Sequence, residues 1–528
     1  MFKKKLSLGS LFLCCVFSFF AQNYECKKWE VVDIGFRAVI NEGNPFVMEF
    51  GAIFTHENGK KMNVPGFYNG DDNWMIRFCP SEVGVWVFET YAAVAPLDGQ
   101  NGKISVAQNT GQHGAVQVHP TVPQRFIYED GTPYFPLAFE VDWLFALDAN
   151  NVSAIPRTKK MVKHLVNYRF NKVIMNVYAS EASWGEKDKI EDKYNFAQPT
   201  VFPFGGTNEN PDYSILNVDF FKHFDRVISH LNDNEIIAHL MIYVWNKKVN
   251  WAKPGSDADN MYFDYVVRRY QAFPNLIWDI SKEALAYGRD DMDYIVERIE
   301  RLKKQDAHER LVTVHDYKFC YNYPELLDFI SIQEWRPNLY NQMLQATKAH
   351  PRQPVFNVEH GGYEQSMHTI FHGAYTDAVV CLERSYECIF AGTYTTYYWQ
   401  NSSWYEVVYE PFELPKAQQP KFEYYKILMD FFEKYDYSQF IAKQYVYSPY
   451  CLSNEKDQFI YLVPSGMYAV QGSIPPAANH KKVKVQWFDP LTGAYSKPLE
   501  KTLNSWMNFI KPESTTSPFA LMIIEVLE

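Results

Sequence analysis

Short runs of alternating apolar and polar residues dominate the first part of the chain. They lie at residues 31–36, 46–50, 74–78 and 85–88. An alternation of period two predicts strands with one buried face, and turn signals such as Asn58-Gly59 and Asn69-Gly70 separate the runs. Residues 22–115 are therefore predicted to form an N-terminal β-sandwich.

The middle of the chain alternates between strand-type and helix-type patterns. Strand-type segments lie at residues 135–143, 172–179, 236–245, 276–283, 311–317, 329–335, 355–360 and 392–399. Apolar residues at spacings of three and four mark helices between them, at residues 218–232, 293–305 and 341–349 among others. Eight such repeats predict an α/β fold, a (β/α)8 TIM barrel over residues 116–440. Long insertions at 180–217 and 246–261 are expected on its active face.

Both ends of the chain have their own patterns. Short strands return after residue 440, at 459–463 and 482–488, so residues 441–528 are predicted to form a C-terminal β-sandwich. At the other end, Lys3, Lys4 and Lys5 precede an apolar run over residues 6–20, the pattern of a secretory signal peptide ending at Ala21. We expect a secreted or periplasmic protein. Leu13 stands before Cys14 where a lipoprotein signal needs a small residue, which disfavours a lipid anchor.

Charge and composition exclude several classes of protein. The chain has 51 Lys and Arg against 62 Asp and Glu, a net charge of −11, which disfavours nucleic acid as a partner. No apolar stretch after residue 21 reaches the roughly 20 residues that a membrane span needs. The aromatic content of 17% suits sugar stacking as well as core packing.

The usual local motifs of cofactor and metal sites do not occur. The six cysteines after residue 21 lack the close pairs of a structural zinc site, although an exported protein could join Cys26 to Cys79. There is no serine nucleophile elbow, phosphate-binding loop or zinc-protease motif, so we expect no cofactor. The acidic segment at residues 288–293 fits either a calcium loop or the start of a helix.

Two glutamates stand at the carboxyl ends of predicted barrel strands. Glu283 ends the fourth strand and Glu359 ends the seventh. Reactive groups of these barrels lie at the carboxyl ends of the strands, and two carboxylates across the barrel mouth can flank one glycosidic bond. The pair therefore predicts an O-glycosyl hydrolase acting on a carbohydrate. Asp279, in the same strand as Glu283, is an alternative acid.

Three stretches carry a resemblance to a known group of proteins. Residues 64–86 resemble the immunoglobulin-like module of exported bacterial glycoside hydrolases, and residues 487–493 resemble a collagen-binding-type C-terminal module. The strand-four and strand-seven glutamates resemble those of retaining (β/α)8 hydrolases, especially the apiosidase-like and family 5-like branches. The resemblance implies that Glu359 is the nucleophile and Glu283 the acid/base. Lys282 stands where that clan usually has an Asn that binds the sugar 2-hydroxyl.

Polar and aromatic residues at other strand ends are expected to bind the substrate, a plant or algal polysaccharide or oligosaccharide. They are Trp143, Asn176, His239, Tyr243, Trp245, His315, Gln333, Trp335 and Trp399. The resemblance implies that Trp399 is the platform under the reacting sugar. Each aromatic ring is open to a second interpretation, as ordinary core. The competing class of function is a non-catalytic carbohydrate-binding or surface-scaffold protein on a degenerate barrel.

Overall fold

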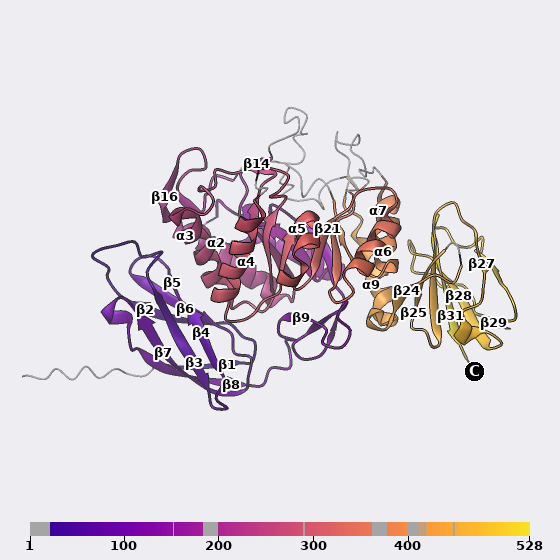
Figure 1. Cartoon of the computed structure of the whole chain (residues 1–528), viewed down its shortest axis with the longest axis horizontal. Helices are drawn as coiled ribbons and strands as arrows, with labels where there is room; N and C mark the ends of the chain where they lie inside the picture. Colours follow the sequence, from indigo (N-terminus) through magenta and orange to yellow (C-terminus); the bar gives the residue numbers. More distant parts are fainter. Residues whose placement is uncertain are drawn as a thin grey trace, which may run out of the picture.

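The computed structural model describes residues 22–151, 153–182, 199–288, 291–361, 377–399, 412, 415–416, 419–446 and 449–527. The expected signal peptide, residues 1–21, lies outside these ranges, as does part of the first long insertion. Figure 1 shows three parts in chain order, with an N-terminal sandwich, a central barrel and a C-terminal sandwich. Within the described ranges, no helix is long and apolar enough to cross a membrane.

The N-terminal part is a sandwich of two sheets. One sheet has the order β1 (Gln22–Lys27), β8 (Asn101–Ala107), β7 (Gly84–Ala92), β3 (Phe50–His56) and β4 (Lys61–Pro65), and the other has β2 (Val32–Arg37), β6 (Asn73–Phe78) and β5 (Phe67–Tyr68). Alternating residues such as Phe54, Trp74 and Trp86 fill the core between the sheets.

One expected strand is wrong, because β3 begins at Phe50 instead of residue 46. Phe46 belongs to a turn whose ring packs edge-on against Tyr265 of the barrel, at 5.6 Å between centroids.

The central part is an eight-stranded sheet in which the recorded strand pairs are all parallel. In chain order its strands are β12 (Leu137–Glu140), β13 (Lys172–Asn176), β17 (Ile237–Val244), β19 (Leu276–Lys282), β20 (Val312–His315), β21 (Ile330–Gln333), β22 (Val355–Glu359) and β23 (Tyr394–Tyr397). The sheet starts at β20 and ends at β21, and the Thr313 and Ser331 hydroxyls of these two strands lie 2.9 Å apart. The sheet therefore curls into a nearly closed barrel, and the predicted TIM barrel is confirmed.

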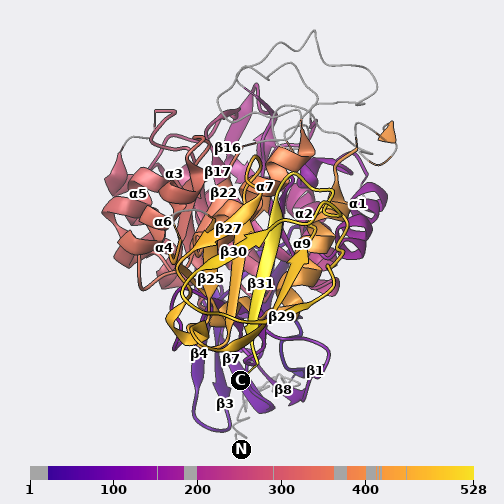
Figure 2. The same ribbon diagram turned by 90° about the vertical axis from the view of Figure 1, so that its right-hand side faces the viewer.

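Helices surround the barrel strands, as Figures 1 and 2 show. They are α1 (Pro156–Asn167), α2 (Val218–Asp233), α3 (Asp257–Tyr270), α4 (Met292–Gln305), α5 (Tyr317–Asn322), α6 (Leu339–Ala349), α7 (Ala378–Phe390) and α9 (Phe422–Lys434). A small three-stranded sheet has the order β11 (Pro133–Tyr134), β10 (Phe126–Tyr128) and β9 (Val116–Val118). Two short pairs join β14 (Glu181–Ala182) to β18 (Lys247–Lys248) and β15 (Phe204–Gly206) to β16 (Pro211–Leu216).

The C-terminal sandwich pairs a large sheet with a small one. The large sheet has the order β24 (Ile441–Lys443), β25 (Tyr450–Ser453), β26 (Gln458–Val463), β31 (Ala520–Val526), β28 (Lys482–Phe488) and β29 (Leu499–Thr502), and the small one pairs β27 (Ala469–Gly472) with β30 (Met507–Ile510). In Figure 2 this sandwich stands in front of the barrel. It contacts the barrel through rings such as Tyr340 and Tyr450, which are stacked at 3.5 Å.

A buried ion cluster joins the N-terminal sandwich to the barrel. Asp225 of α2 binds Arg77 of β6 at 3.2 Å and Arg269 of α3 at 2.7 Å. The two guanidinium groups hold the pKa of Asp225 well below its usual range, against the opposing effect of its burial.

The cysteines of the described residues are all free thiols, including Cys26 and Cys79. The bridge considered between those two residues is not formed.

Candidate active site

The carboxyl ends of the barrel strands bring distant residues together at one face. Glu140 ends β12, Asn176 ends β13, Lys282 ends β19 and Glu359 ends β22, and Glu283 follows Lys282 directly. Parallel strands in a closed barrel point their carboxyl ends the same way, so these side chains share one mouth.

Glu359 is buried among polar partners. Its Oε2 accepts a hydrogen bond from Gln333 Nε2 at 2.9 Å, its Oε1 forms an ion pair with Lys282 Nζ, and His315 Nε2 lies 3.6 Å from the same Oε1. Burial raises the pKa of Glu359 to about 7, Lys282 counteracts this rise, and the charge of Glu283 adds to it. Glu359 is thus a buried carboxyl whose ionisation depends on its neighbours.

Glu283 sits at a local distortion of strand β19. The register between β19 and β20 shifts between Asp279 and Lys282, and Glu283 has a φ of 57°, in the left-handed region that non-glycine residues seldom adopt. Its backbone N–H donates to His315 O at 3.2 Å. Such strained backbone is found most often at functional sites.

The Glu283 carboxyl is electrostatically linked to Glu359. Burial raises the pKa of Glu283, while Lys282 and a hydrogen bond from Gln333 lower it. The charge of Glu283 in turn raises the pKa of Glu359. One side-chain amide has two N–H groups, so Gln333 can bind both carboxyls at once.

Four further charged residues complete the site, and the sequence interpretation gave none of them a role there. Lys282 Nζ donates to Glu140 Oε1 at 2.7 Å and lies 3.6 Å from Asp142 Oδ2, which in turn is 3.5 Å from Lys247 Nζ. Glu140 and Asp142 could have been recognised from the sequence as site residues, because both carboxylates stand at the end of the first predicted barrel strand. Lys247, in the short strand β18 within the second long insertion, carries no such signal.

Unpaired polar atoms mark where a ligand would be received. Asn176 is fully buried, yet neither its Oδ1 nor its Nδ2 has a hydrogen-bond partner within the part of the chain described, and the same holds for Asp142 Oδ1. Buried polar groups normally have partners, and sugar hydroxyls can supply them. His315 is neutral, because burial and then Lys282 lower its pKa well below the usual range.

Two expected substrate-binding residues face other parts of the barrel. His239 Nε2 bonds to Asp279 Oδ2 at 2.8 Å in the fully buried interior, where Asp279 also accepts the backbone N–H groups of Ser281 and His315. These three bonds occupy Asp279, which favours Glu283 over Asp279 as the acid.

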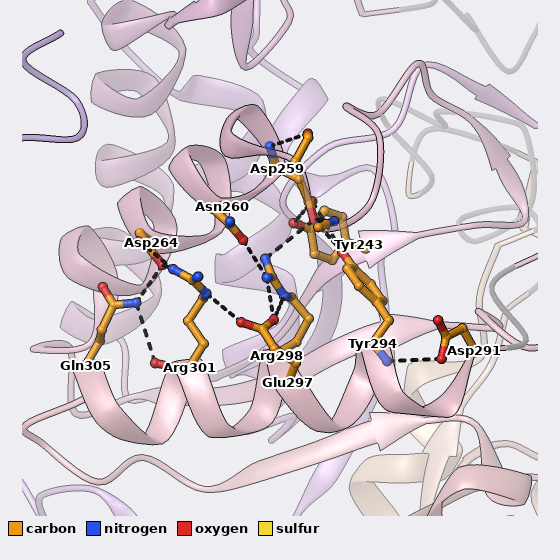
Figure 3. Close-up of polar contacts among 12 residues, drawn as sticks. Tyr243, Asp259, Asn260, Asp264, Asp291, Tyr294, Glu297, Arg298, Arg301 and Gln305 are labelled. Carbon is orange, nitrogen blue, oxygen red and sulfur yellow. Dashed lines mark hydrogen bonds and ion pairs between the residues drawn. The ribbon is translucent and has the colours of Figure 1, made fainter. Parts of the chain in front are cut away.

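Tyr243 is directed to the surrounding helices. Figure 3 shows its hydroxyl donating to Asp259 of α3, at 2.6 Å, and the hydroxyl of Tyr294 of α4 bonding to the same carboxyl at 3.0 Å. Arg298 of α4 lies 3.5 Å from that carboxyl. Tyr243 therefore links β17 to the helix layer, and the expected contact with substrate is not supported.

The four tryptophans at strand ends differ in exposure. Trp143 and Trp399 are 1% and 0% exposed, which favours the core interpretation for both rings. Trp245 is half-buried and stacks on Tyr243 at 5.6 Å, so it joins the same aromatic layer. Trp335 is half-buried, contacts Tyr398 edge-on at 5.5 Å, and has no partner for its Nε1 among the described residues. Trp335 is thus the ring best placed to meet a ligand.

No described group of three or more His, Cys, Asp or Glu side chains could hold a metal ion. Residues 289 and 290 of the acidic segment considered as a calcium loop lie outside the described ranges.

Comparison with known proteins agrees with this geometry. Residues 25–93 match a domain of unknown function, DUF5060, and residues 122–446 match the profile "Apiosidase-like, catalytic domain". No curated protein matches the chain.

Solved structures share the fold at low sequence identity. A candidate glycoside hydrolase from Bacteroides vulgatus is similar over 96% of this chain and 100% of its own, with 19% identity and a TM-score of 0.77. A family 5 glycoside hydrolase from the same species is similar over 78% of this chain and 94% of its own, with 14% identity and a TM-score of 0.56. Because the Apiosidase-like profile covers more than half of the chain, the protein belongs to the Apiosidase-like family and is a glycosidase.

Proposed function

We propose that the protein is an exported retaining glycoside hydrolase in which Glu359 is the nucleophile and Glu283 the acid/base. The observation that carries the proposal is the position of these two buried carboxyls at one barrel mouth, one directly after β19 and the other at the end of β22, where the charge of Glu283 raises the pKa of Glu359. A retaining mechanism needs carboxyl groups about 5 to 5.5 Å apart. The electrostatic effect of one carboxyl on the other supports a short separation.

The first half of the reaction forms a covalent intermediate. An ionised Glu359 oxygen attacks the anomeric carbon, the bond from that carbon to the leaving oxygen breaks, and Glu283 gives its proton to that oxygen. Burial raises the pKa of Glu283, which is the direction that an acid needs.

The second half returns the enzyme to its starting state. The now ionised Glu283 takes a proton from water, the resulting hydroxide oxygen bonds to the anomeric carbon, and Glu359 leaves as a carboxylate. Two displacements at one carbon give net retention of configuration.

The charges of the site favour a neutral sugar at the point of cleavage. The site holds two ammonium groups, those of Lys247 and Lys282. They face four carboxyl groups, which belong to Glu140, Asp142, Glu283 and Glu359. Both ammonium groups are already paired with carboxyls of the protein, so neither is left to bind the carboxylate of a uronic acid. We infer a neutral sugar residue of a plant or algal polysaccharide or oligosaccharide, met outside the cell after export by the segment at residues 1–21.

The test is a screen of the purified mature protein on plant and algal glycans, with apiose-containing ones included because of the family to which the chain belongs. Once a substrate is found, proton NMR of the first sugar released distinguishes retention from inversion. Release of the inverted anomer would refute the two-glutamate mechanism. Preference for a uronoside over the neutral glycoside with the same leaving group would refute the inference about charge.

A further inference from the structure

Lys282 occupies a central place among the charges of the site. Its side chain is 1% exposed, and its Nζ bonds to Glu140 Oε1 at 2.7 Å while forming an ion pair with Glu359 Oε1. Glu140 comes from β12 and Glu359 from β22, so this single ammonium connects three strands of the barrel.

Without that ammonium, Glu359 would be a buried carboxyl beside other carboxyls. Burial and the charge of Glu283 both favour its protonated form, and Lys282 acts in the opposite direction. A protonated carboxyl is a poor nucleophile, so the proposed reaction needs a nearby positive charge.

The hydrogen bond between Lys282 and Glu140 has a separate role. When Glu359 forms an ester with the sugar, it loses its charge and Lys282 loses that partner. A buried ammonium without a partner is costly, by several kcal/mol in general. Besides Glu359, Lys282 has carboxyl oxygens of Glu140 at 2.7 Å and of Asp142 at 3.6 Å, so the cation would still have carboxyl partners in the ester intermediate.

We propose that Lys282 is a positioning residue, anchored by Glu140, that keeps Glu359 ionised and holds its carboxylate in place for attack. This inference rests on the proposed function. Lys282 thereby differs in role from the sugar-binding Asn that related hydrolases have at this position, because its ammonium binds two carboxyls of the protein instead.

Several groups face Glu359 and contribute to its ionisation. The titratable ones are Lys282 at the end of β19, Glu283 and Tyr287 after it, Lys247 of β18, Glu140 at the end of β12, Asp142 after it, His315 of β20 and Tyr398 after β23. Gln333 of β21 adds a neutral hydrogen bond. Lys282 is the ammonium that contacts Glu359 directly among the described residues.

The first experiment needs no substrate. Infrared spectra recorded across a pH titration report the C=O stretch of a protonated carboxyl, and subtracting the spectra of Glu359→Gln isolates the signal of Glu359. For Lys282→Met, the spectra of the double variant Lys282→Met/Glu359→Gln are subtracted in the same way. Removal of the adjacent positive charge in Lys282→Met is expected to raise the titration midpoint of Glu359 by about 1 to 3 pH units.

Lys172→Met is the matched control. Lys172 is also fully buried in the barrel, but it begins β13 at the opposite end and its Nζ lies over the Phe356 ring, 3.9 Å from the centroid. Its replacement removes a buried lysine that does not contact Glu359 and whose pKa burial lowers to about 7, so the midpoint of Glu359 should not move. An equal shift in both variants would overturn the proposal, as would no shift in Lys282→Met.

The second experiment uses an aryl glycoside that the wild type hydrolyses. In Lys282→Met the acid limb of kcat/KM should move to higher pH, giving about a tenfold or greater loss one pH unit below the wild-type limb and a partial recovery at alkaline pH. A loss that is uniform across pH would indicate a merely structural residue. Lys282→Gln, which keeps a polar contact with Glu140, is the second variant, and failure of both to fold would reject a positioning role.

The two proposals fail in different ways. If the wild type hydrolyses none of the glycosides, the proposed function is wrong, and the infrared titration still decides what Lys282 does. If the wild type is active and neither the midpoint nor the acid limb moves, the function stands and the role of Lys282 is wrong.

Discussion

Replacement of Glu359 by Gln is expected to remove activity while changing stability in a pH-dependent way. Gln keeps the shape of the side chain, but its single oxygen can accept from only one of the two donors, Gln333 and Lys282, and it has no anionic oxygen to attack the sugar. The rate should fall on the order of 10⁴-fold or more.

The stability change follows from the pKa of Glu359. Burial raises that pKa from 4.5 to about 7, so the folded protein binds this proton more tightly than the unfolded chain does. Stability is therefore lost as the pH rises from 4.5 to 7, and the difference of 2.5 units corresponds to about 3 kcal/mol. The Gln variant has no such loss. It should match the wild type near pH 4.5 and be more stable by up to that amount above pH 7.

Thermal unfolding of both proteins at several pH values between 5 and 8 checks this reasoning. Glu334→Gln is a matched control with the opposite sign: burial raises the pKa of Glu334, but hydrogen bonds from Arg336 outweigh that effect and the net pKa is lowered. Its stability relative to the wild type should therefore change only below about pH 4.5, where this carboxyl takes up its proton, and stay constant between pH 5 and 8. A difference between Glu359→Gln and the wild type that does not change with pH would refute the argument, and near-normal turnover would refute the nucleophile.

Three other substitutions have distinct expected outcomes. Glu283→Ala should slow substrates with poor leaving groups far more than activated aryl glycosides, and azide should restore its activity; equal losses on both substrate types would move the acid role elsewhere. Trp399→Ala should lower the melting temperature, because a fully buried ring is lost at a cost of about 3 to 5 kcal/mol; unchanged stability with a raised KM would instead support the sugar platform. Asp225→Asn leaves Arg77 and Arg269 without their shared carboxylate and should destabilise the fold by about 3 to 5 kcal/mol; calorimetry showing no change would contradict this.

The sequence by itself determined the barrel and the places of the two glutamates. Alternation of strand and helix patterns is a local property, and the carboxyl end of each strand follows from where its apolar run stops. Because parallel barrel strands share one active face, Glu283 and Glu359 had to lie at the same mouth once the barrel was recognised. The profile match over residues 122–446 confirms the barrel and the family.

Only the tertiary structure decided how the side chains around these glutamates are used. The pattern placed His239 and Tyr243 on one strand as equal candidates, yet one bonds to Asp279 in the interior and the other to Asp259 of α3. Lys282 was noticed only as a departure from a family pattern, and its bond to Glu140 joins residues 142 positions apart. The physical reason is that strand periodicity specifies only where a side chain leaves the backbone. The partner that the side chain contacts depends on burial, charge pairing and local distortions such as the one at Glu283. All three depend on segments that are distant in the sequence.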